Sequence, residues 1–138
     1  MIDLEKAMYL VEGFREKTLP LHEWTHEAHL VVAFYFLFHF DIFQAVCYLR
    51  SGIIGYNQSV GTENNTNKGY HETLTLFWAK IIKKYIEQES EKDFLEALND
   101  FLESPQANRN LQLDYYLPET IFSIEARAFW IEPSLKSL

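Results

Sequence analysis

Three histidines lie close together in the segment Leu-His-Glu-Trp-Thr-His-Glu-Ala-His-Leu, which runs from Leu21 to Leu30. If the segment is helical, a rotation of about 100° per residue places His22, His26 and His29 within about 60° of one another. Imidazole groups gathered on one face are typical of sites that bind a metal ion or move a proton. We therefore expect a functional site on this face.

His71 is a further candidate, because it precedes a helix with a clear apolar stripe. Leu74 and Trp78 continue that stripe, so the His71 side chain is expected to point inward. Helical bundles build metal sites from ligands on facing helices. Three imidazoles, from His26, His29 and His71, suit zinc, iron or nickel and leave a position for water. The sequence therefore predicts a divalent metal ion as cofactor, with a bound water that ionises near neutral pH.

Two acidic residues are candidates for the catalytic base of such a site. Glu23 lies between His22 and His26 in a segment that matches the H-E-x-x-H pattern of zinc proteases. That pattern is short, and the sequence shows no strand that could hold an extended peptide, so a protease is not favoured. Glu72 lies in the first turn of the later helix. Glu23 and Glu72 are thus the predicted catalytic residues of a metal-dependent enzyme acting on a small molecule.

The same histidines also allow a structural interpretation. A buried imidazole often donates a hydrogen bond to a carbonyl or carboxylate and packs as an aromatic ring. In this alternative the histidines form a polar network in a non-enzymatic domain that binds a small ligand or a partner. A metal bound to the folded state would make stability sensitive to a chelator, whereas a polar network would not. The sequence leaves open whether the protein is an enzyme.

Tryptophans and arginines are the remaining candidates for ligand contacts. Trp24, Trp78 and Trp130 could line an apolar pocket, although aromatic residues at helical spacing are more often part of the core. Arg50, Arg109 and Arg127 could each bind a substrate carboxylate, or form structural ion pairs.

The composition narrows the class of protein. The chain has 138 residues, of which 48% are hydrophobic and 16% aromatic, and its net charge is −8. Nucleic acid and anionic membranes are therefore not expected partners, because both attract basic surfaces. The single cysteine, Cys47, and a start without a basic leader favour the cytoplasm. A small molecule is the expected partner, and the abundance of aromatic residues makes a homodimer plausible.

Helical periodicity extends over nearly the whole chain. It predicts one all-α domain over residues 1–138, a bundle of about five to six helices. Asp41 is placed to cap the third helix, and Ser90 with Asp93 resembles a capping arrangement for the fifth. The polar, Asn-rich segment 55–69 is expected to be a loop that forms a rim or lid. The expected helices cover residues 3–17, 20–40, 42 to about 54, 70 to about 86, about 94–102 and 118–130.

The chain contains three motifs, each of which occurs once. They are W-T-H-E-A-H-L at residues 24–30, G-Y-H-E-T-L-T at 69–75 and I-F-S-I-E-A-R at 121–127. In this combination the chain resembles a family of small, functionally uncharacterised bacterial proteins. The resemblance implies no reaction, but it implies that residues of all three motifs share one site. The residues so grouped are Trp24, Thr25, His26, His29, Tyr70, His71, Glu72, Thr75 and Arg127.

Substrate contacts are expected from the members of this group that are neither metal ligands nor acids, together with one tryptophan of the later helix. These predicted substrate-binding residues are Trp24, Thr25, Tyr70, Thr75, Trp78 and Arg127.

Overall fold

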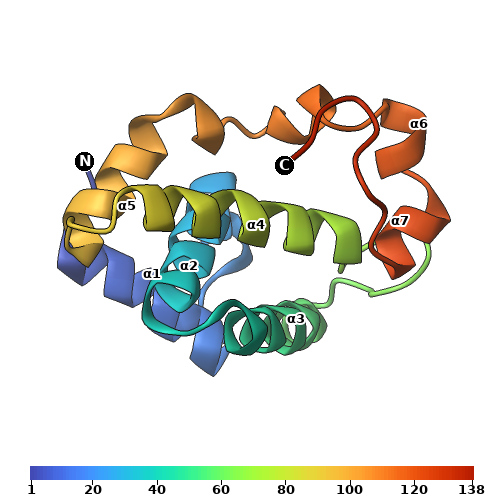
Figure 1. Cartoon of the computed structure of the whole chain (residues 1–138). Helices are drawn as coiled ribbons and strands as arrows, with labels where there is room; N and C mark the ends of the chain where they lie inside the picture. Colours follow the sequence, from blue (N-terminus) through green and yellow to red (C-terminus); the bar gives the residue numbers. More distant parts are fainter.

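The computed structural model describes residues 1–138 and contains seven α-helices and no strand (Figure 1). Five helices have ten residues or more, so the expected all-α bundle of five to six helices is confirmed in its class. Short 3₁₀ turns cover Leu21–Glu23, Pro105–Ala107 and Leu111–Asp114. The α-helices are α1 (Leu4–Glu16), α2 (His26–His39), α3 (Ile42–Ser59), α4 (Glu72–Gln88), α5 (Phe94–Glu103), α6 (Pro118–Ile121) and α7 (Ile124–Ala128).

Aspartates begin three of the five long helices. The side chains of Asp3, Asp41 and Asp93 each accept a hydrogen bond, 2.8–2.9 Å long, from the amide three residues further on. Each bond satisfies one of the amides that the first helical turn leaves without a partner. The cap expected at Asp41 is therefore confirmed, and of the expected Ser90 and Asp93 arrangement it is Asp93 that caps α5.

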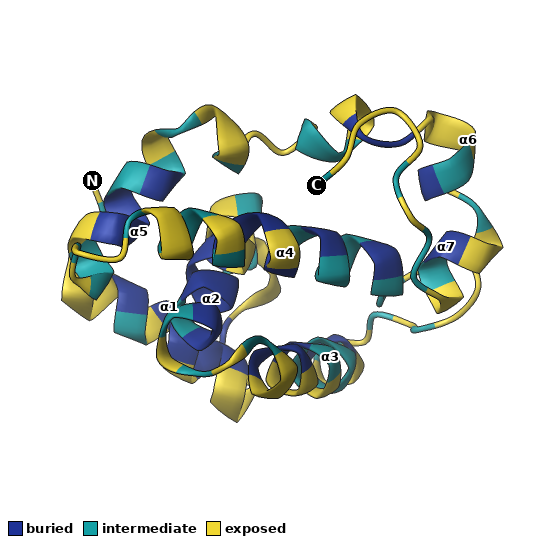
Figure 2. Ribbon diagram, viewed as in Figure 1, coloured by how far each residue is buried: buried dark blue, intermediate teal, exposed yellow.

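Helix α2 lies at the centre of the bundle, where it packs against α1, α3, α4 and α5. Its residues Leu30, Val31, Val32, Phe34 and Leu37 are all buried (Figure 2). A helix with apolar residues on every side is stable only when other elements surround it, as they do here. Neither α2 nor any other helix is both long and apolar enough to cross a membrane.

The start of this central helix differs from the prediction. We expected the helix to begin at Pro20, but α2 begins at His26. The side chain of Thr25 caps it by accepting a hydrogen bond from the Ala28 amide. Just before this cap, the Trp24 ring packs between other aromatic rings and its backbone leaves the helical region. The residues of H-E-x-x-H therefore do not share one helix, and His22 is separated from the later histidines.

Two further boundaries also differ. The expected loop 55–69 is shorter, because α3 continues to Ser59 before the chain turns. Asn64 then orders the loop: its side-chain oxygen accepts a hydrogen bond from the Tyr70 amide at 2.9 Å. The last expected helix, 118–130, is interrupted, since Ser123 caps α7 and thereby separates it from α6. Asn64 and Ser123 each accept a hydrogen bond from a backbone amide. Hydrophobic periodicity does not predict such bonds between side chain and backbone.

Candidate functional site

A cavity of about 580 Å³ with a largely apolar lining lies between α2, α3 and α4. The loop before α4 and the turn at Arg109 complete its wall. Nine of the sixteen lining residues are hydrophobic. The lining residues are Trp24, Thr25, His26, His29, Leu30, Val32, Ala33, Leu49, Ile53, Gly69, Tyr70, His71, Leu74, Thr75, Trp78 and Arg109.

Most of the residues that the sequence singled out meet at this cavity. The eight that line it are Trp24, Thr25, His26, His29, Tyr70, His71, Thr75 and Trp78. The two predicted catalytic acids, Glu23 and Glu72, and the predicted substrate ligand Arg127 do not line it.

His71 connects the ends of two helices. Its Nδ1 accepts a hydrogen bond from the Leu74 amide at 3.1 Å and so caps α4. Its Nε2 donates to the carbonyl of Ile121, the last residue of α6, at 2.8 Å. This arrangement requires the neutral ring with its proton on Nε2. Burial, opposed by the bond to Ile121 and aided by the nearby Arg127 charge, lowers the pKa of His71. The ring points inward as predicted, but neither nitrogen is free.

His26 is also engaged with a backbone carbonyl. Its Nε2 lies 2.9 Å from the oxygen of Ala107, and because a carbonyl only accepts, this nitrogen carries a proton. The bond ties the start of α2 to the turn that follows α5. The His26 ring also contacts Trp78, edge to face, with ring centres 5.4 Å apart. His26 therefore holds two walls of the cavity together.

Like His26, His29 has a protein partner for only one of its two ring nitrogens. Its Nδ1 donates to the Thr25 carbonyl at 2.7 Å, and its ring stacks on Trp24 with centres 3.8 Å apart. Although His29 is an exposed residue, desolvation by the surrounding protein lowers the pKa of its imidazole to about 4. His29 is therefore neutral at pH 7, and its Nε2 can accept a hydrogen bond from a ligand.

This geometry does not support the expected metal site. The protein brings no three His, Cys, Asp or Glu side chains into an arrangement that could hold a metal ion. The reason is that the imidazoles form hydrogen bonds with the backbone. Both nitrogens of His71 have backbone partners, and His26 and His29 each have one nitrogen bonded to a backbone carbonyl. Imidazoles that line one cavity are thus directed to the backbone instead of to a common point.

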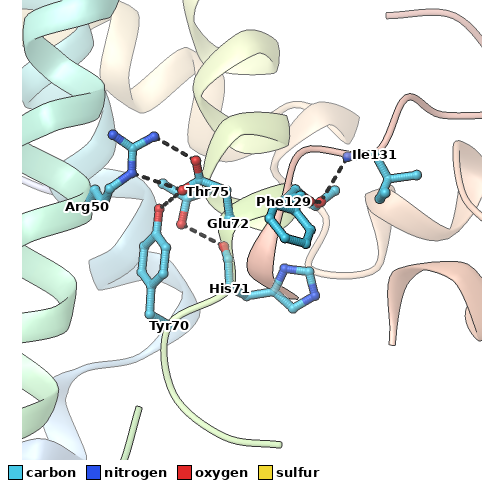
Figure 3. A network of polar contacts seen from close by, with 8 residues as sticks. Arg50, Tyr70, His71, Glu72, Thr75, Phe129 and Ile131 are labelled. Carbon is cyan, nitrogen blue, oxygen red and sulfur yellow. Dashed lines mark hydrogen bonds and ion pairs between the residues drawn. The ribbon is translucent and has the colours of Figure 1, made fainter. Parts of the chain in front are cut away.

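Glu72 lies on the other side of the chain from the His71 ring (Figure 3). Both of its oxygens bind Arg50, at 3.0 and 2.6 Å, and one also accepts from the Tyr70 hydroxyl at 2.5 Å. The hydrogen bonds from Arg50, partly opposed by burial, lower the pKa of Glu72. A carboxylate held in this way is a poor base, and its placement does not support the predicted catalytic role. It anchors α4 to α3 and holds Tyr70 in the cavity wall.

The other two residues outside the cavity have structural contacts. Glu23 accepts a hydrogen bond from the Tyr9 hydroxyl at 3.1 Å on the outer surface, so its placement does not support a role as base. Arg127 donates to the carbonyl of Gly69 at 3.0 Å. It therefore supports the loop that carries Tyr70 into the wall, and it is not in a position to contact a ligand in the cavity.

Arg109 lines the cavity in place of Arg127. The sequence offered it only as one of three scattered cations, because no helical register relates it to the histidines. The bond from His26 to Ala107 fixes the turn that carries it. This tertiary contact, between residues 81 positions apart in the sequence, helps to place Arg109 at the site.

The lining supplies groups for recognition more than for reaction. It contains no Ser, Cys, Lys, Asp or Glu, and the Thr75 hydroxyl donates to the His71 carbonyl at 2.9 Å. Burial and its bond to Glu72 raise the pKa of Tyr70 to about 12, so this phenol stays protonated.

Comparisons with protein-family models, curated proteins and solved structures give no significant match, so the cavity itself is the basis for assigning a function.

Proposed function

We propose that this protein binds a small, mainly apolar organic molecule in the cavity between α2, α3 and α4. The observation that carries the proposal is the cavity itself, with a volume of about 580 Å³ and nine hydrophobic residues among sixteen. Sites for small ligands typically have volumes of roughly 300–1,000 Å³ and combine an apolar lining with a few polar groups. The non-enzymatic alternative from the sequence is thus favoured over the metal-dependent enzyme.

The polar groups of the cavity fit binding better than catalysis. A nucleophile needs a neighbouring base or a lowered pKa, and the lining has neither a serine nor a cysteine to activate. A general base acts best with a pKa near the working pH, but the pKa of His29 is about 4. The Nε2 of His29 serves instead as a hydrogen-bond acceptor, which favours a ligand with an N–H or O–H group.

The test is a titration with the neutral dye N-phenyl-1-naphthylamine, whose fluorescence rises in apolar surroundings. Trp24 and Trp78 line the cavity, so excitation of tryptophan should also excite the bound dye by energy transfer. We expect a saturable signal with a Kd on the order of 10–100 µM for a ligand of this size.

Variants that fill the cavity show whether the dye binds there. Ala33→Leu and Ile53→Phe add volume to two different walls and should each weaken binding at least tenfold. Ala128→Leu adds the same side chain at an exposed position of α7 and should have no effect. Circular dichroism checks that each variant is folded. Unchanged binding by both cavity variants would disprove the proposed site.

A further inference from the structure

The cavity differs in charge from the rest of the protein. The chain has 20 acidic residues and 12 Lys or Arg residues, yet no acidic side chain lines the cavity. Arg109 is its one cationic residue with a fixed charge, since the pKa of His29 lies far below 7. An organic anion in this cavity therefore meets no acidic side chain of the lining.

Arg109 is also free to bind a ligand. Its guanidinium is in none of the protein's ion pairs, whereas Arg50 is bound by Glu72 and Lys92 by Glu89 and Asp100. The residue lies in a turn closed by a hydrogen bond from the Leu111 amide to the Asn108 carbonyl. An exposed arginine that is part of a cavity wall lies at the opening, where its planar group can reach a carboxylate with two hydrogen bonds.

We infer that the ligand is an organic monoanion, with its apolar part between α2, α3 and α4 and its carboxylate bound to Arg109 at the opening. This inference rests on the proposed function and adds the chemical class of the ligand. A single cation matches a single negative charge, whereas inorganic phosphate is usually held by several cations and backbone amides. The nine hydrophobic residues require that most of the ligand be apolar.

A matched pair of ligands isolates the charge. 2-Naphthoate and 2-naphthamide have the same ring system and nearly the same shape, but only the first is an anion. Their affinities are measured directly by isothermal titration calorimetry with the wild-type protein, Arg109→Gln and Arg15→Gln. Arg15 is exposed in the last turn of α1 and does not line the cavity, so its substitution removes one positive charge elsewhere.

Loss of the charge-assisted hydrogen bonds should weaken 2-naphthoate binding about tenfold in Arg109→Gln. The same variant should leave 2-naphthamide binding within about twofold, and Arg15→Gln should leave both ligands within about twofold, because exposed distant charges are screened. Arg109 has no hydrogen bond within the protein, so its substitution is not expected to affect folding. Inorganic phosphate should give no binding heat.

The outcomes separate the inference from the function on which it rests. If both naphthalenes bind and Arg109→Gln changes neither or both equally, the inferred monoanion is wrong while the binding function stands. If inorganic phosphate binds and 2-naphthoate does not, the inferred class is also wrong. If neither naphthalene binds to the wild-type protein while N-phenyl-1-naphthylamine does, the inference fails and the binding function stands; if the dye does not bind either, both fail.

Discussion

Replacement of His71 by alanine tests the structural role assigned to this residue. The imidazole caps α4 through Nδ1 and donates to the last carbonyl of α6 through Nε2. The substitution removes both bonds at a residue that is 8% exposed. The Leu74 amide then loses its acceptor, and the Ile121 carbonyl loses its donor in a buried position. The expected result is a loss of stability without any involvement of a metal.

The size of the loss follows from the two bonds. Removing a side chain that caps a helix costs about 1 kcal/mol. Leaving a buried carbonyl without a donor costs about 1–2 kcal/mol more. We therefore expect His71→Ala to lower the free energy of unfolding by about 2–3 kcal/mol. Asparagine is a good cap but too short to reach Ile121, so His71→Asn should recover about 1 kcal/mol of that loss.

Urea unfolding followed by circular dichroism measures these differences, with an unchanged dependence on urea as the sign of an unchanged unfolding transition. His22→Ala is the control, because the His22 side chain is 82% exposed and makes only a long contact with Glu23. A chelator should not alter the wild-type curve. The reasoning is refuted if His71→Ala is as stable as the wild type, if asparagine recovers nothing, or if a chelator lowers wild-type stability as far as the substitution does.

Two further predictions concern pH and packing. The pKa of His71 and of His29 is lower in the folded protein than the usual 6.5, so the unfolded chain binds more protons as the pH falls below about 6.5. The free energy of unfolding should thus be level above pH 7.5 and decrease from pH 6.5 towards 4, and this decrease should be smaller in His71→Asn than in the wild type. Urea unfolding curves at a series of pH values measure both proteins. An equal decrease in the two would contradict the prediction. Gly52→Ala should lower stability by about 1–3 kcal/mol, because its Cβ would lie 2.5 Å from the buried Phe14 ring. Gly55→Ala is the control, because its Cβ meets only the end of a lysine side chain, and it should raise stability by up to about 1 kcal/mol. Thermal unfolding measures both variants. Equal melting temperatures in the two variants would contradict the packing argument.

Helix interiors and several helix starts could be predicted from the sequence because they depend on neighbours a few residues apart. The capping aspartates Asp41 and Asp93 act on amides three residues away, and the apolar character of α2 requires burial wherever the helix lies. The inward position of His71 follows from the same periodicity. The start of α2 was misplaced because stacking of Trp24 on Phe14, ten residues earlier in the chain, contributes to the break before Thr25.

The gathering of Trp24, His26, His29, Tyr70 and His71 at one place was predicted, and these residues do share one cavity. Their chemistry was not predicted correctly, because a residue's type and position on a helix do not say where each ring nitrogen points. That depends on which carbonyls come within about 3 Å, and these belong to Ala107 and Ile121, far along the chain.

Local spacing in the sequence accounts for the all-α class, the main amphipathic faces and the inward direction of His71, whereas the wider group of residues at the cavity was expected from the resemblance of three motifs to a family. Only the tertiary structure decided that the imidazoles bind carbonyls, that Glu72 is held by Arg50 and that Arg109 is the cation of the cavity. The physical reason is that hydrogen bonds and ion pairs act over about 3 Å, and which groups come that close is decided by the packing of segments 22 to 81 residues apart.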